Sequence, residues 1–293
     1  MKYMNECKDD NENQEMEMET LKKEEKTASS ETLASQASSF HGFVAGFLNH
    51  IFKTSPENTE HVLDILYYLN EKDWEKHYSE IKEKFIDSLI ELNATPSFNQ
   101  SFLKLLGKAC IFPSFMNIER FPKMVSKVIL KNIHEKNNNT IIKNSWVLAN
   151  LCTNCHNFNL FSLEENQELL LLCLSYANST KEKIVSNGFR ALGYYISNHS
   201  DQSLCDTLAL SNVNSEKIKA SLSDVYLKPF TKCSVKVCWN VCVSLSNILK
   251  SFKPNFTQTF FTQDIFFNIA EILTAKNNFK TQIHCIEVIS LSF

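Results

Sequence analysis

The chain has 293 residues and a mass of 33.7 kDa, and its 30 basic and 33 acidic side chains give a formal net charge of -3 at pH 7. This near balance argues against a nucleic-acid-binding protein, which usually carries a basic excess. With only five glycines, the chain contains no Gly-rich phosphate loop and no G-x-S-x-G motif. We therefore expect no enzymatic activity, no catalytic residue and no cofactor.

The N-terminal sequence has no apolar segment of the kind that forms a secretory signal. The longest apolar run, Leu169 to Leu174, is far shorter than the ~20 residues that a membrane-spanning helix needs. The ten cysteines are then expected to be free thiols in a reducing compartment. We expect a cytoplasmic or nuclear protein that does not insert into a membrane.

Residues 1–36 are rich in Glu, Lys, Asn and Ser, and they carry ten acidic and five basic side chains. Such a segment cannot bury enough apolar surface to offset the entropy of ordering it. We predict a disordered acidic leader, which is either an interaction segment or a solvated extension. A single helical domain is predicted for residues 37–293.

Helical patterns begin after this leader. Apolar residues of segment 40–52 recur at helical spacing and form one stripe, which we assign to core packing because its polar face lacks basic residues. Ser55-Pro56 and Thr95-Pro96 are typical helix starts, and Ser162 with Glu165 fits a capping box. No convincing alternation of period two is present, so the sequence predicts an all-α protein.

Three segments share one pattern, in which an apolar anchor is followed by a small residue. The pairs are Leu148-Ala149, Leu192-Gly193 and Leu245-Ser246, with weaker copies at Leu106-Gly107 and Ile289-Ser290. Successive anchors are 42, 44, 53 and 44 residues apart, and three of these spacings fall in the roughly 40–47-residue range of HEAT and armadillo repeats. The long spacing predicts an insertion of about nine residues, which we place between Asn198 and Asn214.

Each repeat is expected to consist of two antiparallel helices, A and then B, which bury a continuous core only when the repeats stack. The small residue after each anchor would let the neighbouring helix approach closely. Asn-rich turns such as residues 137–139 separate A from B. The four A helices are predicted near residues 122–134, 164–176, 216–227 and 264–273.

Residues 183–193, KIVSNGFRALG, are similar to a K-V-K-x-N-A-x-R-A-L-G-N unit. Residues 235–247, VKVCWNVCVSLSN, look like a K-V-R-W-N-A-C-x-A-x-G-N unit, and residues 278–284, NFKTQIH, like the turn that follows it. In this order, residues 140–292 resemble the C-terminal repeats of the HEAT repeat-containing protein 6 family. Members of that family are much longer, and the resemblance implies a protein-binding HEAT/armadillo scaffold without a catalytic site.

Trp146-x-x-x-Asn150 resembles the ladder of the armadillo importins. There, Asn carboxamides hold the backbone of an extended peptide and Trp rings form slots for its basic side chains. Arg190 stands at the Trp position of the next repeat and would repel a basic peptide. The alternative to peptide binding is that Trp146 packs in the core and Asn150 caps a helix end. The corresponding pairs in the following repeats are Arg190 with Tyr194 and Val243 with Asn247.

Lys183, Lys236 and Lys280 each lie nine residues before an anchor. They are therefore predicted to align at the N-termini of three successive B helices, where the helix dipole disfavours a cation. Either each lysine pairs with an acidic residue of a neighbouring repeat, or the three form a basic ridge for an acidic partner segment.

Cys152-Thr-Asn-Cys155-His156 matches the C-x-x-C-H pattern of covalent haem attachment. It lies at the end of a predicted B helix, where buried free thiols are the simpler interpretation. The spacing of the cysteines near residue 238 also suits packing better than a tetrahedral zinc site. We expect no bound metal, and we keep a haem or metal protein as a remote alternative.

The sequence thus predicts an α-solenoid of HEAT/armadillo type with five to seven helical pairs. We interpret it as a non-enzymatic scaffold that binds protein partners on its concave B-helix surface, with an importin-like carrier of an extended cargo peptide as the alternative. The chain stops at Phe293 inside a predicted helix, so we expect an exposed apolar end, as in a piece of a longer protein.

Overall fold

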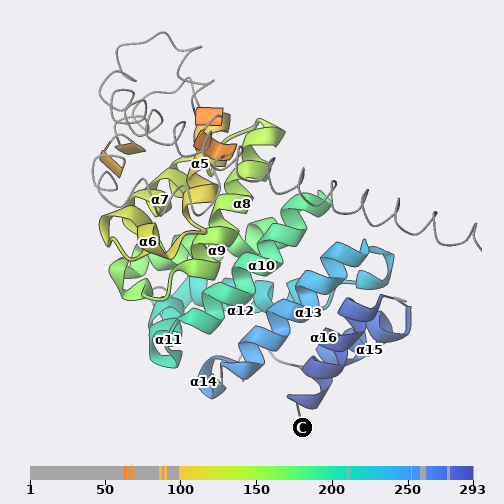
Figure 1. Ribbon diagram of the computed structural model, residues 1–293. Coiled ribbons are helices and arrows are strands. Elements are labelled where there is room, and N and C mark those ends of the chain that lie inside the picture. Colours follow the sequence, from red (N-terminus) through yellow and green to blue (C-terminus); the bar gives the residue numbers. More distant parts are fainter. Residues whose placement is uncertain are drawn as a thin grey trace, which may run out of the picture.

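The computed structural model describes residues 63–64, 66–68, 86–87, 89–90, 99–209, 212–251, 253–257, 262–275 and 278–292. Every regular element in these ranges is helical, which confirms the predicted all-α class (Figure 1). The predicted acidic leader and the apolar stripe of residues 40–52 lie outside the described residues. The elements are α5 (Asn99–Ala109), α6 (Pro113–Met116), α7 (Arg120–Lys131), α8 (Asn138–Asn154), η3 (Phe158–Leu160), α9 (Leu163–Ala177), α10 (Glu182–Asn198), α11 (Asp201–Ala209), α12 (Asn212–Tyr226), η4 (Phe230–Lys232), α13 (Val235–Lys250), α14 (Pro254–Thr257), α15 (Gln263–Ala275) and α16 (Phe279–Ser290).

From α6 onward the helices form units of three rather than the predicted pairs. A short first helix (α6, η3, α11 or α14) precedes a long second helix (α7, α9, α12 or α15) and a long third helix (α8, α10, α13 or α16). The prediction of two-helix units is wrong because it lacks the first helix of each unit. Most of these first helices are short: α6 and α14 have four residues each and η3 has three. One helical turn is too short to show a periodicity in the sequence.

The helix α11 contributes to the unusual repeat spacing. It lies inside the stretch where the insertion was predicted, and it has nine residues where the other first helices have three or four. Leu204, Thr207 and Leu208 are buried. The Asp201 carboxylate accepts hydrogen bonds from the backbone of α14, at 3.2 Å from Asn255 N and 3.0 Å from Phe256 N. The insertion therefore connects the third and fourth units through these hydrogen bonds.

The predicted A helices correspond to the second helices of the units, with shifts of a few residues at their ends. The capping box at the start of α9 is confirmed. Glu165 N donates to Ser162 Oγ at 3.2 Å, and Ser162 N donates to Glu165 Oε2 at 3.0 Å. These bonds satisfy backbone donors that a helix start leaves without partners.

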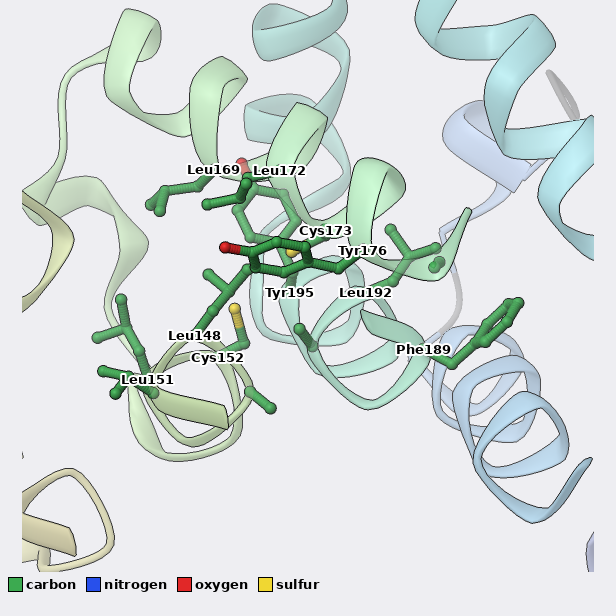
Figure 2. Packing of buried hydrophobic residues seen from close by; sticks show 14 of the residues in the cluster. Leu148, Leu151, Cys152, Leu169, Leu172, Cys173, Tyr176, Phe189, Leu192 and Tyr195 are labelled. Atoms are coloured by element: carbon green, nitrogen blue, oxygen red, sulfur yellow. The ribbon is translucent and has the colours of Figure 1, made fainter. Parts of the chain in front are cut away.

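The predicted anchors lie in the core. Leu106, Leu148, Leu192 and Leu245 are fully buried, and Figure 2 shows how side chains of α8, α9 and α10 interdigitate around two of them. The small residues act as expected. A Cβ added to Gly193 would lie 2.5 Å from Ser244 Cα on α13, so only glycine allows the two third helices to approach this closely.

The two described C-terminal helices expose several apolar side chains. Ile289 occupies the fifth anchor position and is only partly buried. The large exposed apolar side chains of α15, α16 and the turn after it are Phe267, Phe279, Ile283, Ile286 and Leu291.

Candidate functional site

The third helices form one continuous layer. α8 packs against α10, α10 against α13 and α13 against α16, so these helices lie side by side along the solenoid, and α5 continues the row before α8 (Figure 1). α7, α9 and α15 pack against α8, α10 and α16 on the other side of this layer. We call the side that points away from these second helices the free face.

The glycines of α10 fix which residues lie on this free face. A Cβ added to Gly188 would lie 2.3 Å from Ala177 N of α9, so that direction points to the second helix. Arg190 follows two residues later and therefore points about 200° away, onto the free face. Lys183 lies two turns before Arg190 on the same side, and Tyr194 one turn after it.

The N-caps of the third helices, Asn137, Lys181, Ser234 and Asn278, give the common register. The second residue after the cap is Asn139, Lys183, Lys236 or Lys280; the ninth is Trp146, Arg190, Val243 or Glu287; and the thirteenth is Asn150, Tyr194, Asn247 or Leu291. The residues predicted from the sequence as candidate binding residues thus fall in three rows on the free face.

Asn150 is engaged inside the protein. It is 3% exposed, and its Nδ2 donates to the backbone oxygen of Gly107 on α5 at 2.8 Å. Its Oδ1 accepts a hydrogen bond from Arg190 Nη2 on α10. The carboxamide thus links three successive repeats, and it would have to exchange these partners to hold a peptide.

Trp146 is partly buried beside this link. Its ring lies so close to Gly107 that an added Cβ would be 2.4 Å from the ring. The Tyr67 ring meets it edge to face, with 6.5 Å between the ring centroids. The ammonium groups of Lys104 and Lys108 lie 5.9 and 5.7 Å from the Tyr67 ring centroid. This part of the surface already holds two cations against an aromatic ring.

Arg190 is a half-buried cation without a carboxylate partner in the described part of the chain. Its Nε is buried and has no hydrogen-bond partner there. Burial lowers the pKa of the guanidinium, because desolvation disfavours the charged form. An arginine nevertheless stays protonated at neutral pH, so its charge is uncompensated.

Two further buried donors on α13 have no acceptor among the described residues, Trp239 Nε1 and Asn247 Nδ2. Both residues are partly buried. Tyr194 is likewise partly buried and packs against the core cluster. In the sequence, Trp239 stands out only as part of a family resemblance. Its position in the repeat register, five residues after the N-cap Ser234, is the signal that distinguishes it.

Lys183, Lys236 and Lys280 are exposed, as the predicted alignment requires. None of their ammonium groups forms an ion pair or a hydrogen bond with another residue that the structure describes. Within the described residues, the expected pairing with an acidic residue of the neighbouring repeat is therefore not found.

Glu287 is a free-face residue that the sequence analysis did not single out. Its carboxylate forms an ion pair with Lys250, accepts from Ser246 Oγ at 2.6 Å and lies 3.0 Å from His284 Nδ1. The Lys250 ammonium, followed by the Ser246 hydroxyl, lowers the pKa of Glu287 to about 2. The acidic residue is thus already neutralised by partners on α13 and α16.

The C-x-x-C-H residues are not brought together as ligands. Cys152 is fully buried between α8 and α9 (Figure 2), and the Cys155 thiol donates to Asn157 O at 3.7 Å. His156 is exposed and lines a hollow of about 330 Å³ beside the end of α8. Among the described residues no group of three or more His, Cys, Asp or Glu side chains is placed to hold a metal ion. One of the two thiols of this motif therefore lies in the core of the described structure.

Comparisons with known proteins agree with the three-helix unit. A designed armadillo repeat protein, YIII(Dq)4CqI, superimposes with a TM-score of 0.62 at 12% identity, over 84% of this chain and 98% of that one. A second design, YIII(Dq.V1)4CPAF in complex with the peptide (KR)4, gives a TM-score of 0.58 at 12% identity, over 80% and 92%. A computationally designed armadillo repeat protein for modular peptide recognition gives 0.57 at 11% identity, over 84% and 98%.

These likenesses establish an armadillo-type repeat fold. No family model matches the sequence. None of the described helices is long and apolar enough to cross a membrane.

Proposed function

We propose that this chain is a non-enzymatic scaffold that binds an extended segment of a protein partner along its free face. The observation that carries the proposal is the set of unpaired donors on adjacent third helices, namely Arg190 Nε, Trp239 Nε1 and Asn247 Nδ2. A buried donor without an acceptor costs free energy. A partner's acceptors would remove that cost when these side chains turn outward, because the donors themselves are buried in the unbound protein.

An extended polypeptide is the partner that suits this arrangement. Its backbone carbonyls recur along its whole length, whereas a compact ligand would reach the donors of one helix only. The donors lie on α10 and α13, and the layer of third helices continues on both sides of them. Repeat solenoids commonly use such a long surface to bind partners.

The structural neighbours support this proposal at the level of the fold. One of them is described with a bound (KR)4 peptide and another as designed for modular peptide recognition. These properties belong to the designed proteins. They make peptide binding by the present chain a reasonable proposal, because the fold is similar over most of both chains.

An importin-like carrier of a basic cargo peptide is the second candidate. It is supported by Trp146 and by the basic peptide of one designed neighbour. The position of Arg190 in the Trp row and the engagement of Asn150 within the core oppose it. We therefore rank it below a scaffold with a different partner chemistry.

We also propose that the chain is related to the HEAT repeat-containing protein 6 family and acts in the cytoplasm or the nucleus. The first proposal rests on residues 183–193 and 235–247, which coincide with α10 and α13. The second rests on the nine described cysteines, which are free thiols. We propose no nucleic-acid partner.

The test is photo-crosslinking with a library of linear peptides of about 14 residues, a length that in extended form spans several repeats. A benzophenone amino acid replaces Val243 on the free face of α13 in one protein. It replaces Glu168, an exposed residue of α9, in the control. We expect enriched peptides to crosslink at position 243 only. Equal crosslinking at both positions, or at 168 alone, would contradict the proposal.

A further inference from the structure

The cations of the free face outnumber the acidic groups that are available to balance them. Arg190, Lys183, Lys236 and Lys280 have no carboxylate partner among the described residues. Glu287 is the acidic residue of the ninth-residue row, and Lys250 and Ser246 already bind it. The face thus carries an excess of positive charge, although the whole chain has a net charge of -3.

Two further acidic residues accept hydrogen bonds within the protein. Asp64 Oδ1 accepts from Lys104 Nζ at 3.1 Å. Glu182, at the start of α10, accepts from the backbone N–H of Ser234 at 3.1 Å and so helps to cap α13. Among the described residues, neither carboxylate forms an ion pair with Arg190 or with the three lysines.

The positions of the lysines strengthen the positive potential. Each is the second residue after an N-cap, in the first turn of α10, α13 or α16. The helix dipole places partial positive charge there, so a lysine is less stable at this position than an acidic residue would be. The same dipole favours a carboxylate that arrives from outside.

Arg190 adds a less hydrated cation at the centre of the layer. Its side chain is half-buried between repeats, held through Nη2 by Asn150, and its Nε has no acceptor among the described residues. A partly desolvated charge without a counter-ion is costly, and a carboxylate within reach of it forms a strong charge-assisted hydrogen bond.

The spacing of these cations fits an extended chain. Packed helices lie roughly 8–10 Å apart, and an extended chain advances roughly 3.3 Å per residue, so about two to three residues span one repeat. Lys183 and Arg190 lie seven residues apart on α10, about 10 Å along the helix axis. A chain that crosses the first turns of α10, α13 and α16 therefore passes Lys183, Lys236 and Lys280 in turn, one lysine on each helix.

We infer that the segment bound by this face is acidic, with Asp or Glu side chains about every second or third residue. Carboxylates of this partner bind Arg190 and the lysine ridge of Lys183, Lys236 and Lys280. The inference rests on the proposed function and specifies the chemistry of the partner. It excludes the basic cargo of an importin-like carrier as the favoured ligand.

The test is fluorescence anisotropy with three labelled peptides of about 14 residues. They differ only in the residue that alternates with serine, which is Glu, Gln or Lys. We expect the Glu peptide to bind at least tenfold more tightly than the Gln peptide near physiological ionic strength, and the Lys peptide to bind most weakly. The affinity of the Glu peptide should fall as salt is raised.

Variants then locate the binding. Lys183→Glu/Lys236→Glu should weaken binding of the Glu peptide at least tenfold, and Arg190→Gln should weaken it as well. The matched control is Lys127→Glu/Lys232→Glu, which makes the same charge change at exposed lysines of α7 and η4. It should change the affinity less than twofold. Circular dichroism and the melting temperature establish that each variant is folded.

Several outcomes would overturn the inference. Equal binding of the Glu and Gln peptides, preference for the Lys peptide, or an equal loss in the control variant would each do so. Tighter binding of a single-stranded oligonucleotide of equal charge than of the Glu peptide would indicate that the partner is a nucleic acid and not a protein. If library peptides crosslink at position 243 but none is acidic, the proposed function stands and this inference fails. If no peptide crosslinks there, both fail.

Discussion

Arg190 on α10 donates from Nη2 to the Oδ1 of Asn150 on α8, and the same carboxamide donates from Nδ2 to the backbone of α5. The two residues come from the predicted peptide ladder. Their side chains instead connect successive repeats. What remains for a partner is the rest of the guanidinium, because Nε is buried without a hydrogen-bond partner among the described residues. Arg190 therefore places a positive charge at the ladder position that the uncharged Trp146 holds in the preceding repeat.

The Asn150 link makes a stability prediction. Asn150→Ala removes two buried hydrogen bonds and leaves the Gly107 carbonyl without its donor, so we expect the free energy of unfolding to fall by about 1–3 kcal/mol. Asn247→Ala, at the equivalent position of α13, serves as the control. Its Nδ2 has no acceptor among the described residues, so its loss should leave stability unchanged or slightly raised. Urea unfolding at pH 7 measures both values, and equal losses would refute this account of the link.

Close packing of the third helices can be tested at Gly193. Gly193→Ala places a Cβ where Ser244 Cα would be 2.5 Å away, so α13 must shift. We expect a loss of about 1–3 kcal/mol in the free energy of unfolding. Ser197→Ala, on the same helix, should change it by less than about 0.5 kcal/mol. Thermal and chemical unfolding provide the comparison, and a Gly193→Ala protein of unchanged stability would mean that the helices do not pack this closely.

The lysine ridge should cost stability. Lys183→Glu exchanges a cation for an anion in the first turn of α10, and we expect the free energy of unfolding to rise by about 0.3–1 kcal/mol at low ionic strength. The gain should shrink at high salt, because the interaction is exposed. Lys127→Glu, within α7, should give no such gain. A stabilised variant that binds the acidic peptide less well would separate binding from folding, and destabilisation by Lys183→Glu would contradict the dipole argument.

The Glu287 cluster predicts a dependence of stability on pH. The folded-state pKa of this carboxyl is about 2, below its ordinary value of 4.5, with Lys250 as the main cause. Its contribution is therefore present above pH 4.5 and is lost as pH falls through 2. Because the group is partly exposed, we expect Glu287→Gln to lower the free energy of unfolding by no more than about 1 kcal/mol at pH 7. The difference from wild type should shrink at pH 3. A constant difference would show that the charge is not responsible.

The long helices could be predicted from the sequence for a physical reason. Their apolar positions recur with the helical period, and the capping residues Ser162 and Glu165 mark a start that the structure confirms. The anchors of α8, α10 and α13 follow from the spacing of repeats, since only fully buried positions require an apolar residue next to a small one.

The first helices and the site details could not be predicted in the same way. α6 and η3 are single turns, and α11 is a polar segment whose few buried residues give no clear period. The partners of Asn150 come from Gly107 and Arg190, which are 43 and 40 residues away in sequence. No local pattern reveals such contacts. The unpaired donor of Trp239 likewise depends on what α16 places beside it.

The most direct test of the central claim is to determine the position at which the acidic peptide crosslinks. The alternating Glu–Ser peptide is irradiated with protein that carries the benzophenone at position 243 or, as the control, at position 168. The account predicts efficient crosslinking at 243, none above background at 168, and loss of the signal at 243 in the Lys183→Glu/Lys236→Glu protein. Crosslinking that is equal at the two positions, or that survives charge reversal, would contradict it.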